Sequence, residues 1–237
     1  MKRGLLAQVT ALRIGKGDAV LVHSSAGAVE MVEGGATGLI RAIASAVGRE
    51  GSVMVPASDS IAPAVRARRG SRFSDHPAFS FTAVGRNADF LTRHVPFHYP
   101  LGSESPLARL HQLDGGVLLI GADQSSNLAL HLAEIWADMP YTRRLRLVHL
   151  GDDEWKEMTG DPGCTAGFHK IDRILRQARI LKEGKIGDIP AQFMRIRPLT
   201  SMAGEMLRGN PEALLCDDPA CRSCGLARKM VRAVSAI

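Results

Sequence analysis

The chain has 237 residues, of which 45% are hydrophobic and 23% charged, and its formal net charge is +6. These proportions are typical of a globular protein with a buried core, and no apolar run approaches the ~18 residues that a membrane span needs. Only 5% of the residues are aromatic, so a platform for stacking nucleic-acid bases is not expected.

The basic balance leaves two interpretations open. Either the excess basic side chains bind an anionic ligand with several phosphates, or they simply form a solvated surface. The segment 1–18 begins like a secretory signal, but Gln8, Thr10 and Arg13 interrupt its apolar residues. We therefore expect a cytoplasmic enzyme with no nucleic-acid and no membrane partner, and a homo-oligomer remains open.

In chain order, the first predicted elements are an amphipathic helix at 5–12, a buried strand at 19–23, a helix at about 36–47 and a strand at 52–56. A loop at Ser24, Ser25 and Gly27 follows the first of these strands. A strand, a helix and a strand in succession predict a parallel pair with a right-handed crossover.

The middle and the end of the chain continue this alternation. A polar loop or short helix is expected at 61–75, and Ser105 is expected to cap a helix that begins with Pro106. The other predicted elements are strands at 79–84, 117–121 and 144–150 and helices at 85–93, 127–137, 170–183 and 200–210. The pattern predicts one α/β domain over 1–237, with a mostly parallel central sheet sandwiched by helices and a cysteine-rich tail at about 211–237.

One group of polar residues follows the strand at 117–121, where ligands bind in open α/β sheets. Within a helix, Asn127, His131 and Glu134 would share one face. A histidine beside a carboxylate suits a general base, because the carboxylate orients the ring and stabilises the imidazolium. The alternative is that these residues and Asp138 form the solvated face of an amphipathic helix.

Two longer stretches resemble a known family. The residues SPLARLHQLDGGVLLIGADQSSNLALHLAE at 105–134 and GDAVLVHSSAGAVEMVEGG at 17–35 are similar to signature regions of the aminoglycoside 3-N-acetyltransferases. The HPAFSF, GFHKID and GKIGDIPAQ segments match further parts of that family in the same order. The resemblance implies an α/β fold distinct from the common small acetyltransferase fold.

The resemblance also implies an activity and its residues. Acetyl-CoA would be the donor, His131 would activate the amine of a small-molecule acceptor, and Glu134 and Asn127 would support His131. Coenzyme A would lie at Ser24 and Ser25. His76 would border the site or be a structural hydrogen-bonding residue, and Ser105 would border the donor channel or only cap its helix.

Some positions depart from the family pattern. Typical members have histidines where Phe79 and often Gln124 stand, an aspartate at Ser125 and a threonine at Leu128. The acidic segment that faces a polycationic antibiotic is shortened here, and the chain is basic. Three interpretations therefore stay open: acetylation of an aminoglycoside, acetylation of a smaller amine, and a binding or scaffold protein that has kept only the fold.

The four cysteines indicate a possible metal site. Cys216, Cys221 and Cys224 have the spacing C-x4-C-x2-C, and Cys164 is the fourth. Four thiolates are the ligand set of a structural zinc. Four reduced cysteines without a metal are an equally good interpretation, and an iron–sulfur cluster is a weaker one.

Overall fold

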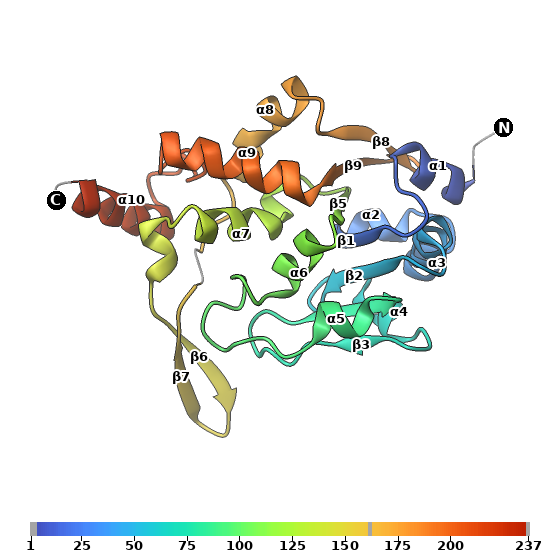
Figure 1. The fold of residues 1–237 in the computed structure, drawn as a ribbon, viewed down its shortest axis with the longest axis horizontal. Helices are drawn as coiled ribbons and strands as arrows, with labels where there is room; N and C mark the ends of the chain where they lie inside the picture. The colour runs from blue at the N-terminus through green and yellow to red at the C-terminus, as the bar shows by residue number, and fades with distance from the viewer. Residues whose placement is uncertain (1–3, 161–162, 236–237) are drawn as a thin grey trace.

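The computed structural model describes residues 4–160 and 163–235 (Figure 1). The strands are β1 (Ala19–Ser24), β2 (Ser52–Pro56), β3 (Arg72–Phe73), β4 (Phe81–Gly85), β5 (Gly116–Ile120), β6 (Arg146–Gly151), β7 (Glu154–Met158), β8 (Lys182–Ile186) and β9 (Ile189–Arg195). Seven of them form one sheet in the order β3-β4-β2-β1-β5-β9-β8, while β6 and β7 form a separate hairpin that projects from the body of the molecule (Figure 1).

The α/β class is confirmed, but the sheet is mixed rather than mostly parallel. Only β1 pairs in parallel, with β2 on one side and β5 on the other. The outer pairings, β2 with β4, β3 with β4, β5 with β9 and β8 with β9, are antiparallel. The expectation failed because α4 leads from β2 to the edge strand β3, from which the chain reverses into β4, and because β8 and β9 form a hairpin. The chain therefore reverses direction at both sides of the sheet.

The helices cover both faces of this sheet. They are α1 (Leu5–Ala11), α2 (Ala26–Glu30), α3 (Gly35–Val47), α4 (Ala62–Arg66), α5 (Ala88–Thr92), α6 (Pro106–Gln112), α7 (Ala129–Trp136), α8 (Asp172–Gln177), α9 (Ile196–Gly209) and α10 (Arg222–Ser235). Short 3-10 turns are η1 (Gln124–Ser126), η2 (Pro140–Arg143) and η3 (Phe168–Ile171). Among the described residues, no helix is both long and apolar enough to cross a bilayer.

Alternation along β1 separates the two cores, because successive side chains of a strand point to opposite faces. Val20 and Val22 pack in the cluster that contains α1 and α3, whereas Leu21 packs in the cluster that contains α6, α7 and α9. The helix α7 runs beside α9 on that second face (Figure 1). The predicted sandwich of helices around a sheet is therefore confirmed.

Several predicted elements need correction. The helix expected at 170–183 is η3 followed by the short α8, and the chain is already in β8 from Lys182. The strands β8 and β9 were not predicted, because four of the five β8 residues are exposed and show no apolar alternation. The loop expected after β1 contains α2, and the helix expected from Asn127 begins at Ala129.

The cysteine-rich tail is part of the core rather than an appendage. Cys216, Cys224, Ala227 and Val231 are buried in the same cluster as α7 and α9. The tail therefore packs on the face of the sheet that carries His131.

Candidate functional site

A cavity of about 390 Å³ opens at the carboxyl ends of the three parallel strands. It is lined by the end of β1, the segment after β2 and the segment between β5 and α7. The lining residues are His23, Ser24, Ala26, Pro56, Ser58, Asp59, Ser60, Ser126 and Leu128. This is the edge at which open α/β sheets bind their ligands.

One serine of this cavity, Ser24, is held by a carboxylate, and the next residue, Ser25, caps a helix. The hydroxyl of Ser24 donates to Asp59 Oδ1 over 2.5 Å, and the Ser24 backbone N–H donates to Asp59 Oδ2 over 2.9 Å. Ser25 caps α2 by accepting from the Ala28 N–H, and its own N–H donates to the Ile120 carbonyl. Both backbone donors are therefore already used, so neither Ser24 nor Ser25 offers a free N–H group to a ligand.

His131 and Glu134 form a buried pair on α7. The ring Nδ1 lies 2.8 Å from Glu134 Oε2, and the two residues are 3% and 1% exposed. The other carboxylate oxygen, Oε1, accepts from the hydroxyl of Tyr141 over 3.1 Å. The edge of the Phe168 ring packs against the imidazole, with ring centroids 5.0 Å apart. The solvated-face interpretation is therefore wrong for His131 and Glu134.

These contacts define what His131 can do. Because a carboxylate can only accept, the hydrogen bond places the proton of the neutral ring on Nδ1 and leaves a lone pair on Nε2. Such a nitrogen can take a proton, and the charge that develops on the ring is then balanced by Glu134. The helix α7 therefore carries a buried histidine that is oriented by a carboxylate.

Asn127 precedes the helix instead of sharing its face. Its Oδ1 accepts from the Ala129 N–H, and its Nδ2 donates to Gln124 Oε1 over 2.8 Å. Gln124, which stands where family members often have histidine, is fully buried and also contacts Met194 Sδ. These contacts fix the start of α7, on which His131 sits, and a catalytic role for Asn127 itself stays a prediction.

The structure gives His76 and Ser105 local roles. His76 Nδ1 accepts from the Ala78 and Phe79 N–H groups, and Nε2 donates to the Phe97 carbonyl. Both ring nitrogens are therefore used, which supports the structural interpretation of His76, and burial lowers its pKa. Ser105 caps α6 by accepting from the Ala108 N–H, as predicted from Ser-Pro.

The four cysteines come together. The sulfurs of Cys164, Cys216, Cys221 and Cys224 all lie within 4.8 Å of one another, and the four are free thiols. Backbone N–H groups donate to two of these sulfurs, Ala166 to Cys164 and Cys216 to Cys224. A hydrogen bond from the Cys224 backbone, with smaller contributions from the other thiols, lowers the pKa of Cys221 to about 7. Burial acts in the opposite direction on Cys164 and Cys224 and raises their pKa values, so it is at Cys221 that hydrogen bonding favours the thiolate, the form that binds a metal.

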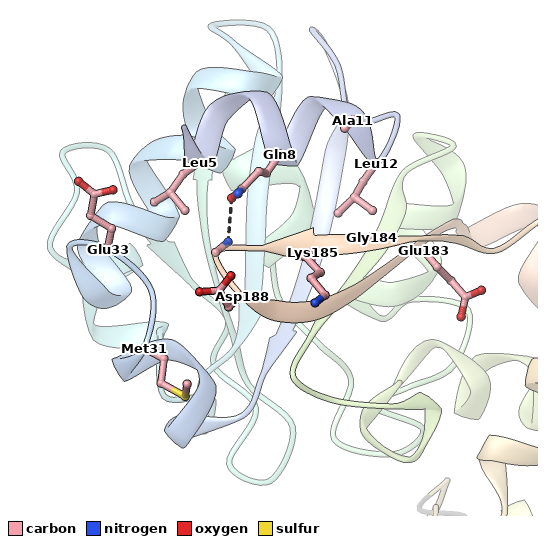
Figure 2. Close-up of a pocket in the computed structure, with 11 residues that line it drawn as sticks. Leu5, Gln8, Ala11, Leu12, Met31, Glu33, Glu183, Gly184, Lys185 and Asp188 are labelled. Atoms are coloured by element: carbon pink, nitrogen blue, oxygen red, sulfur yellow. Dashed lines mark hydrogen bonds between the residues drawn. The ribbon is translucent and has the colours of Figure 1, made fainter. Parts of the chain in front are cut away.

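A second cavity, of about 530 Å³, lies between α1 and the β8–β9 hairpin (Figure 2). Its charged side chains, Glu33, Glu183, Lys185 and Asp188, are exposed, and Gln8 is tied to the Gly187 N–H. None of its lining residues belongs to the serine-lined cavity or to the His131 pair. This second cavity therefore contributes no residue to the His131–Glu134 pair.

Sequence reasoning missed three residues of this region: His23, Asp59 and Tyr141. Their polar atoms are brought to the site by the fold, and no spacing relates them to His131. The position of His23 at the end of a buried strand, directly before Ser24, was the one available signal.

The fold and site together define an α/β protein with a ligand cavity at the carboxyl edge of the sheet and a buried histidine–carboxylate pair on the helix that follows. Comparison with known proteins identifies the family. The family model for aminoglycoside 3-N-acetyltransferases matches residues 21–62 and 60–208, and the chain belongs to this family of coenzyme A-dependent acyltransferases.

Individual relatives agree with this assignment. Aminoglycoside N(3)-acetyltransferase IV of Salmonella sp is 31% identical, over 89% of this chain and 88% of the relative. Aminoglycoside N(3)-acetyltransferase VII of Streptomyces paromomycinus is 30% identical, over 81% and 86%. Among solved structures, a histidine-to-alanine mutant of aminoglycoside acetyltransferase AAC(3)-IVa in complex with a gentamicin superposes with a TM-score of 0.87. That pair is 28% identical, over 97% of this chain and 99% of the other.

Proposed function

We propose that this protein transfers the acetyl group of acetyl-CoA directly to a primary amine of a small molecule, with His131 as general base. The observation that carries the proposal is the buried hydrogen bond between His131 Nδ1 and Glu134 Oε2. Because this pair is intact, a binding or scaffold protein without activity is not favoured.

The chemistry needs one base and no covalent enzyme intermediate. The amine nitrogen attacks the thioester carbonyl carbon, the C–N bond forms, and the carbonyl π electrons move to oxygen. His131 Nε2 takes the proton that the nitrogen loses. When the tetrahedral intermediate collapses, the C=O bond re-forms, the C–S bond breaks, and His131 returns its proton to the departing thiolate.

The serine-lined cavity is the proposed place of the donor. It meets α7 at Leu128, whose carbonyl accepts from the His131 N–H, so the cavity wall and the base are one helical turn apart. The Ser24 hydroxyl donates to Asp59, so its oxygen remains there to accept a hydrogen bond from the coenzyme. The cysteines have no part in the transfer, since they gather in the tail cluster.

The acceptor is proposed to be cationic. Asp172, at the start of α8, has one buried oxygen, Oδ1, without a hydrogen-bond partner in the described part of the chain. Burial raises its pKa, whereas the Arg176 guanidinium, 3.6 Å from its Oδ2, lowers it. Glu183 and Asp123 act on it as further negative charges, so the carboxylates still outnumber the one guanidinium. This local negative charge in a basic protein suits an ammonium group, as on an aminoglycoside or on a smaller amine.

The test is a coenzyme A release assay with acetyl-CoA and a panel of amines that includes gentamicin, apramycin, single amino sugars and simple alkyl amines. We expect release with at least one amine, and mass spectrometry should find that amine heavier by one acetyl group. A protein that binds acetyl-CoA and acetylates none of the panel would favour the scaffold interpretation instead.

We also propose that the four cysteines hold one structural zinc. Zinc–sulfur bonds of about 2.3 Å in a tetrahedron place sulfurs about 3.8 Å apart, and the four sulfurs already lie within 4.8 Å of one another. The residues present therefore fit the ion, which would tie the tail to the segment at Cys164. The tail helix α10 packs against η2, where Tyr141 supports Glu134, so the metal would stabilise the surroundings of the base.

Elemental analysis tests the metal directly. About one zinc per chain is expected, and Cys221→Ser should lower both zinc content and thermal stability. Ser201→Ala, which changes an exposed side chain of α9 outside the cysteine cluster, serves as the control for zinc content. A folded, metal-free preparation with four titratable thiols would contradict the zinc proposal and leave the acetyltransferase proposal untouched.

A further inference from the structure

His23 is a buried histidine that the mechanism above does not use. It lies in β1 with 4% of its surface exposed, and it lines the serine-lined cavity beside Ser24. Its Nε2 atom is buried and has no hydrogen-bond partner in the part of the chain that the structure describes. A buried polar nitrogen without a partner is uncommon in folded proteins and is a frequent feature of functional sites.

The surroundings of His23 differ from those of His131. Burial alone lowers the pKa of His23 from 6.5 to about 3, so the ring is neutral at physiological pH. A neutral imidazole with so low a pKa is a poor base, yet it still carries one N–H that can donate. His23 is therefore suited to donating a hydrogen bond, whereas His131, paired with Glu134, is suited to taking a proton.

His23 and His131 lie on the same side of the sheet. His23 stands opposite Leu119 in the β1–β5 pairing, so it projects to the same face as Leu119 and Leu21. Both leucines pack in the cluster that contains the α7 residues on either side of His131. A ligand that fills the cavity at the carboxyl edge thus contacts His23 and reaches α7 at Leu128.

We propose that His23 is a second catalytic histidine, which donates a hydrogen bond to the carbonyl oxygen of the bound thioester. The inference rests on the proposed acetyl transfer. As the amine attacks, the carbonyl π electrons move to this oxygen, and the His23 N–H stabilises the resulting oxyanion. When the C–S bond breaks, the electrons return to the carbonyl, and no proton leaves His23.

Neutral imidazole is suited to this task because its N–H can donate without the ring first gaining a proton. A donor that is already in place and shielded from water stabilises a developing oxyanion more than solvent does. Packing alone does not explain an imidazole at this position, since an aliphatic side chain would fill the end of the buried strand without leaving a polar nitrogen unpaired.

The experiment that tests this role compares His23→Leu, which removes the donor at similar volume, with His23→Gln, which keeps an N–H donor. Calorimetry measures the affinities for acetyl-CoA and for coenzyme A, which lacks the acyl carbonyl. We expect the wild type to favour acetyl-CoA about fivefold to tenfold, the Leu variant to lose this preference and the Gln variant to keep part of it. In the amine assay, the Leu variant should lose about 10²–10³ in kcat.

The outcomes separate the two proposals. An unchanged preference for acetyl-CoA together with wild-type kcat in His23→Leu overturns the role of His23 and leaves the acetyl transfer standing. A wild type that binds neither acetyl-CoA nor coenzyme A contradicts the proposed function itself. If His23→Leu does not fold, His23→Gln tests the role of His23 instead. A retained preference for acetyl-CoA over coenzyme A supports donation by an N–H at this position. A complete loss of that preference overturns it.

Discussion

Replacing Tyr141 with phenylalanine tests how the base is held. The Tyr141 hydroxyl is buried and donates to Glu134 Oε1 over 3.1 Å, while the opposite oxygen of the carboxylate binds His131. Phenylalanine keeps the ring, so the apolar packing of this fully buried side chain is unchanged. Only the hydrogen bond to the carboxylate is lost.

The expected size of the effect of Tyr141→Phe follows from the kind of hydrogen bond that is lost. A hydrogen bond to a charged group contributes about 1.5–3 kcal/mol, and its loss leaves a buried carboxylate oxygen without a partner. We therefore expect Tyr141→Phe to lower the free energy of unfolding in urea by about 2 kcal/mol. Since about 1.4 kcal/mol corresponds to a factor of ten, kcat should fall by about tenfold and by no more than about 100-fold.

The chain offers a matched control, because its other tyrosine, Tyr99, is 40% exposed. Tyr99→Phe should leave the free energy of unfolding within about 0.5 kcal/mol of the wild type, as surface substitutions usually do. If Tyr141→Phe matched Tyr99→Phe in both urea unfolding and kcat, the account of Glu134 as a carboxylate held from both sides would be refuted.

Three further changes should have measurable effects. Because the folded-state pKa of His23 is depressed to about 3, its contribution to stability is present above about pH 6.5 and is lost as the pH falls, at about 1.4 kcal/mol per unit. Between about pH 6.5 and about pH 5 the wild type should lose about 2 kcal/mol more than His23→Leu in urea titrations, and parallel losses would contradict this. Ser105→Ala removes the cap of α6 and should cost about 1 kcal/mol of unfolding free energy in the same titrations. Asp172→Asn should raise KM for the amine about tenfold and leave acetyl-CoA affinity unchanged in calorimetry; an unchanged KM would remove Asp172 from the acceptor site.

Much of the fold follows from local patterns. The strands β1, β2 and β5 are short apolar runs, and the leucine and isoleucine stripe of α3 has helical spacing, so the parallel centre of the sheet was predictable. Local patterns failed at the β8–β9 hairpin, because the edge strand β8 is mostly exposed. In β8 only Ile186 is buried, and the two-residue turn Gly187–Asp188, in which Gly187 has φ +64°, was the available hairpin signal.

The site was predictable only in part. The spacing of His131 and Glu134 placed them on one helix face, but spacing alone does not tell a buried pair from a solvated one. The packing of α7 against α9 and Phe168 decides that question. The convergence of Cys164 with three cysteines of the distant tail, and of Tyr141 with Glu134, arises from tertiary folding that no local pattern encodes.

The central claim is that His131 takes the proton of the acceptor amine. The most direct measurement is the turnover of His131→Ala on an amine that the wild type acetylates, beside His149→Ala, which changes an exposed histidine of the β6–β7 hairpin. The account predicts a fall of about 10²–10⁴ in kcat for His131→Ala, with acetyl-CoA affinity nearly unchanged and with His149→Ala at the wild-type rate. Wild-type turnover in His131→Ala would contradict the claim.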